Sequence, residues 1–223
     1  MKYTIILLLL IVLTSCHTAT DYYEEGKKCD EKGNYEEAIK LLDKAIAKRP
    51  DFLDAFIARG YEKLLLSKYK EALSDFEHAL TYDRKNTRIL FDIGCAKRGL
   101  EDWKGALEYY NAAIATKGGP YITMDHIENN FINDPAVKYD VTTAEILFYR
   151  GDVYLHLDSL TKAYYDFRVA ADKKFNTGDA FYSIAYICFI CGKNVEGCGA
   201  LNQAIMNGRK DINPKYLELC GMH

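Results

Sequence analysis

Proline is scarce in this chain, with 4 prolines among 223 residues, and tryptophan occurs once. Neither sign of charge dominates, because 29 Lys and Arg stand against 32 Asp and Glu and give a net charge of −3. A proline inside a helix costs about 3 kcal/mol, so its scarcity permits long uninterrupted helices. The balanced charge argues against a protein that binds nucleic acid through a basic face. With 49% hydrophobic and 27% charged residues, the composition is that of a folded chain.

The first residues resemble an export signal. Residues 5–13 form an unbroken apolar run after the basic Lys2. A run of this length is too short to cross a bilayer, which needs about 20 apolar residues, but it has the length of a signal-peptide core. The Leu-Thr-Ser-Cys sequence that follows and ends at Cys16 resembles the lipobox of bacterial lipoproteins. The alternative is an ordinary secretory signal with an incidental cysteine.

The lipoprotein resemblance implies that residues 1–15 are a signal peptide that is removed and that Cys16 carries a covalent diacylglycerol or acyl lipid. Residues 16–21 would then be a lipidated tether. The resemblance also implies a place in the cell envelope, most often at the outer membrane facing the periplasm. We therefore expect contact with the membrane through the lipid anchor alone, no other cofactor and no nucleic-acid partner.

A repeat of 34 residues follows this segment. Glycine and alanine recur at that spacing, in register with a large apolar residue. The register is carried by Gly26, Gly60 and Gly94, by Ala38, Ala72 and Ala106, by Ala45, Ala79 and Ala113, and by Leu42, Phe76 and Tyr110. This pattern resembles the tetratricopeptide repeat, a helix–turn–helix unit of 34 residues. The small residues of such a unit allow its two helices to approach closely.

The register breaks once and then resumes. Gly94 and Gly151 are separated by one repeat plus 23 further residues. The resemblance implies an all-α fold, a right-handed α-solenoid of about five repeats that begin near residues 19, 53, 87, 144 and 178. We assign the chain to repeats one to three (22–118), an insertion (119–143), repeats four and five (144–209) and a C-terminal capping helix (210–223). The capping helix is indicated by Asn213-Pro214, which is typical of a helix start.

Cys188 and Cys191 form a CxxC motif, which suggests thiol-redox or zinc chemistry. In the repeat register the motif falls at the end of a first helix, where the helix dipole disfavours a thiolate. Cys188 also occupies a packing position, so we favour a role in the core. A zinc site would need four ligands, and no second CxxC supports one.

Export to an oxidising compartment would make Cys198 and Cys220 candidates for a disulfide. In the repeat register Cys198 faces outward from the second helix of repeat five, and Cys220 lies on the apolar face of the capping helix. A disulfide between them would hold a short helix that is otherwise marginal. Cys29 and Cys95 stand alone in distant repeats, and we expect them to be buried thiols.

The sequence contains no pattern of a known catalytic site. Its five histidines are scattered, without an HExxH motif or a Ser/His/Asp arrangement, and there is no glycine-rich phosphate loop. We therefore expect no enzymatic activity, no catalytic residue and no metal site.

The resemblance implies that the first helix of each repeat lines a concave groove that binds a partner. Aromatic residues are common at the mapped groove positions, and such residues dominate binding hot spots. These positions include Tyr23, Lys27, Ile57, Tyr61, Leu64, Phe91, Arg98, Phe148, Leu155, Tyr182, Tyr186 and Phe189. Ala58 and Asp92 replace residues with which chaperone-type relatives grip a C-terminal carboxylate, so that partner class is disfavoured.

Three functions stay open on this evidence. We favour a non-enzymatic scaffold whose groove holds an envelope protein or peptide, since apolar groove residues suit a protein helix. A carbohydrate-binding lipoprotein that stacks sugars on its aromatics is the alternative. A thiol-redox protein that uses Cys188 and Cys191 ranks third.

Residues 180–191 are almost entirely apolar or aromatic, and a helix that is apolar all round is buried all round. Repeat packing covers one face of this helix, so Tyr182, Tyr186 and Phe189 need another cover. We expect the insertion to fold over them as a plug or lid. Its apolar residues are Tyr121, Ile122, Met124, Ile127, Phe131 and Ile132.

Overall fold

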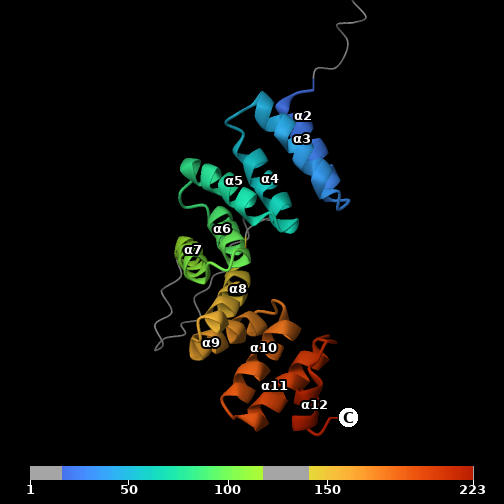
Figure 1. Cartoon of the computed structure of the whole chain (residues 1–223), viewed down its shortest axis with the longest axis vertical. Coiled ribbons are helices and arrows are strands. Elements are labelled where there is room, and N and C mark those ends of the chain that lie inside the picture. Colours follow the sequence, from blue (N-terminus) through green and yellow to red (C-terminus); the bar gives the residue numbers. More distant parts are fainter. Residues whose placement is uncertain (1–16, 118–140, 223) are drawn as a thin grey trace, which may run out of the picture. The chain divides into compact units, whose positions relative to one another are not determined.

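The structure is a computed structural model and describes residues 17–117 and 141–222. These residues form helices joined by short turns, without a strand among them (Figure 1). The helices are α2 (Ala19–Asp30), α3 (Tyr35–Lys48), α4 (Leu53–Leu65), α5 (Tyr69–Tyr82), α6 (Thr87–Gly99), α7 (Trp103–Thr116), α8 (Thr143–His156), α9 (Leu160–Asp172), α10 (Thr177–Ile190), α11 (Asn194–Met206) and α12 (Pro214–Leu219). The expected all-α fold is confirmed.

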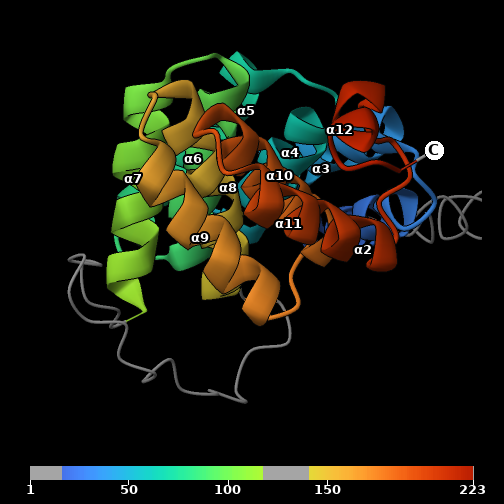
Figure 2. The same cartoon turned by 90° about the horizontal axis from the view of Figure 1, so that it is seen from below.

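The helices pack in pairs, each made of two successive helices. The pairs are α2 with α3, α4 with α5, α6 with α7, α8 with α9, and α10 with α11 (Figures 1 and 2). We refer to them as repeats one to five. Their first helices begin at residues 19, 53, 87, 143 and 177, within one residue of the starts expected from the sequence. The chain divides into two compact parts, Met1–Tyr82 with repeats one and two and Asp83–His223 with repeats three to five and α12.

Glycine in the first helix of a repeat makes room for a large ring on the second helix. A Cβ atom on Gly60 would lie 2.7 Å from the Phe76 ring, and one on Gly94 would lie 2.5 Å from the Tyr110 ring. Repeat five has Ala185 in place of this glycine, and its partner is the smaller Leu201. The alanines of the repeat register are fully buried, so the 34-residue pattern reports close helix packing. They are Ala38, Ala72, Ala106 and Ala163, together with Ala45, Ala79, Ala113, Ala170 and Ala204.

Repeats two and four each carry an ion pair that the sequence pattern did not reveal, part-buried in repeat two and buried in repeat four. The Arg150 guanidinium donates to both carboxylate oxygens of Asp166, with Nε to Oδ2 at 2.7 Å and Nη2 to Oδ1 at 2.8 Å. Arg59 donates to Asp75 in the same two-pronged way from the equivalent positions of repeat two. Such paired charges satisfy each other inside the fold, but removing one partner leaves an unpaired buried charge.

The expected C-terminal boundaries of the tether and of the insertion differ from the structure. Residues 19–21, expected in the tether, form the first turn of α2, because Thr18 caps this helix through a reciprocal pair of hydrogen bonds with Asp21. Val141 is buried and Thr142 caps α8, so residues 141–143 belong to repeat four rather than to the insertion. The rest of the insertion and the signal peptide lie outside the described residues.

The C-terminal helix α12 is short and is held by a covalent bond. Asn213 caps it by accepting a hydrogen bond from the Lys215 N–H, and Pro214 occupies its first position. Cys198 on α11 and Cys220 at the end of α12 form a disulfide with a Cα–Cα distance of 5.4 Å. This is the pair singled out from the sequence.

Candidate functional site

The expected groove positions of repeats one and two lie on α2 and α4. Ile57, Tyr61 and Leu64 follow one another at helical spacing on α4, and all three are half-buried. The Tyr23 ring on α2 is half-buried and packs against Phe52 with their centroids 5.0 Å apart. Burial and the nearby Asp54 carboxylate raise the pKa of Tyr23, so its hydroxyl remains a hydrogen-bond donor at neutral pH.

Lys27 is exposed beside this tyrosine. Its ammonium lies 5.4 Å from the centre of the Tyr23 ring and 3.6 Å from the Glu24 carboxylate. Charged side chains thus lie beside a partly exposed ring on α2, and α4 adds three partly exposed apolar or aromatic side chains.

Phe91 was expected in the groove, and the structure shows that this prediction is wrong. The side chain is 4% exposed. Tyr149 on α8 lies with its ring 5.4 Å away, and Tyr110 lies 5.7 Å away on the other helix of the same repeat. The ring of Phe91 is thus enclosed by its own repeat and by the next one.

Phe148 is half-buried and also serves the core. Its ring contacts those of Phe167 and Phe175 at centroid distances of 5.6 and 5.7 Å. Leu155, on the same helix, is half-buried and packs against the same core cluster. These two side chains of repeat four therefore contact the core and are also partly exposed.

Arg98 joins repeat three to repeat four. Its Nη1 lies 2.9 Å from the Asp152 carboxylate, and its guanidinium lies 5.1 Å from the centre of the Tyr149 ring. Beyond this pair, His156 stacks flat on Trp103 with a centroid distance of 3.8 Å. Neither Asp152 nor the stacked pair was anticipated, because the repeat pattern fixes packing positions and leaves polar contacts between repeats undefined.

The groove positions of repeat five are covered by α12 and the segment before it. Tyr216 on α12 stacks on Phe189 at 4.7 Å and lies 6.2 Å from Tyr182, while the Arg209 guanidinium sits 4.7 Å from the Tyr182 ring. Tyr186 is 39% exposed. The sequence indicated that these aromatics need a cover, and α12 supplies it for Phe189 and Tyr182. The predicted plug by the insertion lies outside the described residues and stays a prediction.

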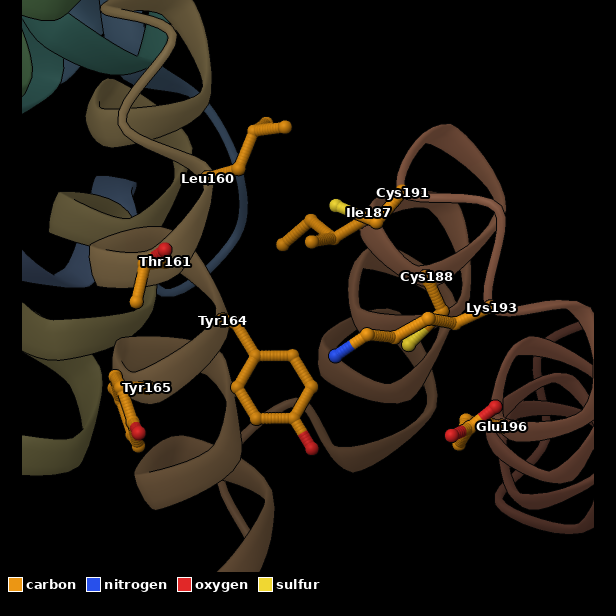
Figure 3. A pocket seen from close by; sticks show the side chains of 9 residues that line it. All are labelled: Leu160, Thr161, Tyr164, Tyr165, Ile187, Cys188, Cys191, Lys193 and Glu196. Carbon is orange, nitrogen blue, oxygen red and sulfur yellow. The ribbon is translucent and has the colours of Figure 1, made fainter.

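A cavity of about 380 Å³ lies between α9, α10 and the start of α11. Figure 3 shows side chains from α9 on one wall and side chains from α10 and α11 on the other. Its lining is Leu160, Thr161, Tyr164, Tyr165, Ile187, Cys188, Cys191, Lys193 and Glu196.

The two thiols of the CxxC motif both line this cavity, but they differ in exposure. Cys188 is buried and Cys191 is exposed. Burial and the Glu196 carboxylate raise the pKa of the Cys188 thiol, which therefore stays protonated at neutral pH and is a poor nucleophile. This favours the interpretation of Cys188 as a core residue.

Two other cysteines are partly exposed as residues, although the sulfur of Cys95 is enclosed as expected. Cys29 and Cys95 are each half-buried. The Cys95 sulfur accepts a hydrogen bond from the Tyr110 hydroxyl at 3.4 Å, and burial raises the pKa of Cys95 to about 12. Within residues 17–117 and 141–222, no cluster of three or more His, Cys, Asp or Glu side chains could hold a metal ion, and no helix is long and apolar enough to cross a membrane.

Comparison with known proteins identifies similar repeats. No protein-family model matches the chain. A human protein, tetratricopeptide repeat protein 12, is 32% identical over 91 residues, which are 41% of this chain and 13% of that protein. A TPR repeat-containing protein of Rhizobium etli is 29% identical over 93 residues, which are 39% of this chain and 45% of that protein. The chain thus spans less than half the length of these two relatives.

Solved structures show the same fold at low sequence identity. PilF of Pseudomonas aeruginosa has a TM-score of 0.69 and 18% identity, over 90% of this chain and 80% of that one. MamA of Desulfovibrio magneticus RS-1 has a TM-score of 0.68 and 14% identity, over 87% and 97% of the two chains. YrrB, described as a TPR protein with an unusual peptide-binding site, has a TM-score of 0.62 and 20% identity, over 92% and 91% of the two chains.

Proposed function

We propose that this chain, a member of the tetratricopeptide-repeat family, is a non-enzymatic scaffold that is anchored by lipid in the bacterial cell envelope and binds a protein or peptide partner. The fold neighbours support the scaffold role, since YrrB is described as having a peptide-binding site. The lipobox-like sequence that ends at Cys16 supports the anchor and the location.

The observation that carries the binding role is the face of α4 formed by Ile57, Tyr61 and Leu64. Their spacing of four and then three residues places them on one side of the helix. Other positions of α4, such as Ala55 and Gly60, are buried by packing, whereas these three side chains stay half-exposed. A row of partly exposed aliphatic and aromatic side chains is the kind of surface that docks an amphipathic helix or an extended peptide.

Site-specific photo-crosslinking in living cells would test this role. A photoreactive amino acid at Tyr61 of the full chain should trap a discrete partner. The matched control is the same amino acid at Glu77, which is exposed on α5 of the same repeat. Partner binding by the α4 face is refuted if no crosslinked adduct forms at Tyr61, or if the adducts at Tyr61 and Glu77 are the same in identity and yield.

Metabolic labelling would test the anchor separately. Labelled palmitate should enter the wild-type chain and not Cys16→Ser, and the variant should keep its signal peptide. Equal labelling of both chains would end the lipoprotein proposal without touching the scaffold proposal.

Carbohydrate binding is the second candidate, and the exposed ring of Tyr186 favours it. Tyr216 on α12 lies near this ring, since Tyr186 is, after burial and Tyr182, one cause of the raised pKa of Tyr216, and the Tyr216 ring also lies 6.2 Å from that of Tyr182. Tyrosine faces can stack on sugar rings. This candidate is removed if the soluble domain binds no sugar on a glycan array. It is also removed if the domain binds a sugar and Tyr186→Ala leaves that binding unchanged. The raised pKa of Cys188 leaves a thiol-redox role as the weakest of the three.

A further inference from the structure

A carboxyl group occupies a position of repeat two that is apolar in the repeats after it. Glu62 on α4 is 3% exposed. The equivalent residues of repeats three, four and five are Ala96, Val153 and Ile187, and all are buried. Moving an ionised carboxylate into such a place is costly unless it is paired. The side chain therefore needs a partner or a proton.

The side chain beside Glu62 is a second carboxyl group and not a cation. The Asp30 side chain, at the end of α2, lies within hydrogen-bonding reach. As a carboxylate, Glu62 has no hydrogen-bond partner for its buried Oε2 among the described residues. As a carboxylic acid, it can donate to Asp30.

The cations near Glu62 in sequence are engaged elsewhere. Arg59 pairs with Asp43 on α3 and with Asp75 on α5, and Lys63 lies 2.8 Å from the Asp75 carboxylate. The C-terminus of α2, where Asp30 sits, carries the negative end of the helix dipole. Each of these features disfavours a negative charge on Glu62.

We propose that Glu62 carries a proton and donates it in a hydrogen bond to Asp30, and that this bond helps to hold α2 against α4, so that the junction between repeats one and two loosens when the proton is lost. The two carboxyls belong to helices that contact each other. Loss of the proton would place a charge on the buried Glu62 beside the half-buried Asp30 carboxyl. The proposal concerns the chain's own junction and stands whether or not the α4 face binds a partner.

The direction of the pH dependence follows from the titration of Glu62. Burial, reinforced by the Asp30 charge and hydrogen bond, raises the pKa of Glu62 to about 8 from an ordinary value of 4.5. Between these values the folded chain binds more protons than the unfolded chain, so stability falls as pH rises. The contribution of Glu62 is complete below its ordinary pKa and is lost as pH passes about 8.

Carbon-13 NMR of the carboxyl groups in the full chain tests directly whether Glu62 is protonated. The Glu62 signal, assigned by its loss in Glu62→Gln, should titrate near pH 8, and Asp30→Asn should move that midpoint to lower pH. Glu77→Gln, on the exposed face of α5, is the matched control and should leave it unchanged. A Glu62 midpoint between pH 4 and 5 would overturn the proposal.

Amide hydrogen exchange then tests the loosening. After correction for intrinsic exchange rates, protection in α2 should fall severalfold between pH 7 and pH 9 in the wild type and in Glu77→Gln. In Glu62→Gln, which keeps the size and a donor but cannot ionise, α2 protection should be the same at both pH values. If that variant does not fold, Asp30→Asn serves instead and should reduce the fall. If α2 protection falls equally in the wild type and in the variant that folds, the proposed role of the Glu62 proton is refuted.

Discussion

Repeats two and five follow the same 34-residue pattern, but different kinds of residue hold their two helices together. In repeat two, Arg59 and Asp75 hold α4 to α5 through an ion pair. The equivalent residues of repeat five, Ile184 and Ala200, are apolar and buried. Charged side chains at the helix crossing thus replace part of the apolar contact in repeat two.

The outer faces of the two repeats differ as well. In repeat five, α12 covers Phe189 and Tyr182 and is fixed by the Cys198–Cys220 disulfide. On repeat two, Ile57, Tyr61 and Leu64 stay half-exposed. The comparison teaches that one packing frame can carry an open face or a closed one, and that the choice is made by residues outside the repeat register.

The largest expected effect comes from breaking the ion pair of repeat two. Asp75→Ala would remove the carboxylate that Arg59 and Lys63 share. Arg59 keeps its pair with Asp43, so we expect a cost near the lower end of the range of about 3–5 kcal/mol for loss of one partner of a buried pair. Urea denaturation should show this loss. Glu77→Ala, on the exposed side of the same helix, should change stability by no more than about 0.5 kcal/mol. Equal small effects would mean that the pair is dispensable.

Opening the disulfide should affect repeat five and spare repeat two. The bond joins residues separated by 22 positions, for which loss of chain constraint costs about 3 kcal/mol. Cys220→Ser should lower the thermal midpoint and expose α12 amides to exchange, while Cys29→Ser should do neither. The idea fails if α12 exchanges at the same rate with and without the bond.

The small residue and its large partner can be exchanged between the two repeats, since repeat two pairs Gly60 with Phe76 and repeat five pairs Ala185 with Leu201. Gly60→Ala would place a Cβ 2.7 Å from the fully buried Phe76 ring, and such overpacking costs about 1–3 kcal/mol. Adding Phe76→Leu reproduces the Ala185 and Leu201 pairing of repeat five. The double variant should therefore lose less stability than the two single variants together.

A double-mutant cycle measured by chemical denaturation would show this as a coupling of more than about 0.5 kcal/mol. Strict additivity would show that the ring does not respond to the added methyl group. Ala185→Gly is the reverse control and should cost more than about 1 kcal/mol, because the lower helix propensity of glycine adds to the loss of a fully buried methyl group.

The sequence predicts this frame well because small residues at a fixed spacing have one physical reason to be there. Gly60 and Ala72 allow two helices to touch, so the register alone places the start of each repeat within one residue. The pattern does not predict which side chains a following repeat covers. Phe91 was misplaced for this reason, since Tyr149 and Tyr110 enclose it.

Polar contacts were missed for a related reason. Arg59 and Asp75 are separated by 16 positions, and their pairing depends on where the two helices cross. Glu62 gives a signal only when its position is compared across repeats, where Ala96 and Val153 show that the site is buried. The repeats can be compared in this way from the sequence alone. That Asp30 lies beside Glu62 follows only from the packing of α2 and α4 in the structure.

The smallest expected effect concerns binding, and it separates the open face from the closed one. Truncation of a partly exposed aromatic anchor costs about 1.4 kcal/mol, or tenfold in affinity, when it is a binding hot spot. Tyr61→Ala should therefore weaken binding of the partner trapped at that position about tenfold, measured by calorimetry with the purified partner. Tyr186→Ala in repeat five should weaken it less than twofold, because α12 covers the neighbouring Tyr182 and Phe189 and leaves the exposed Tyr186 ring without an apolar row around it. Circular dichroism should show that both variants keep the helical content of the wild type. A larger loss at Tyr186 than at Tyr61 would place the binding face on repeat five and reverse the comparison.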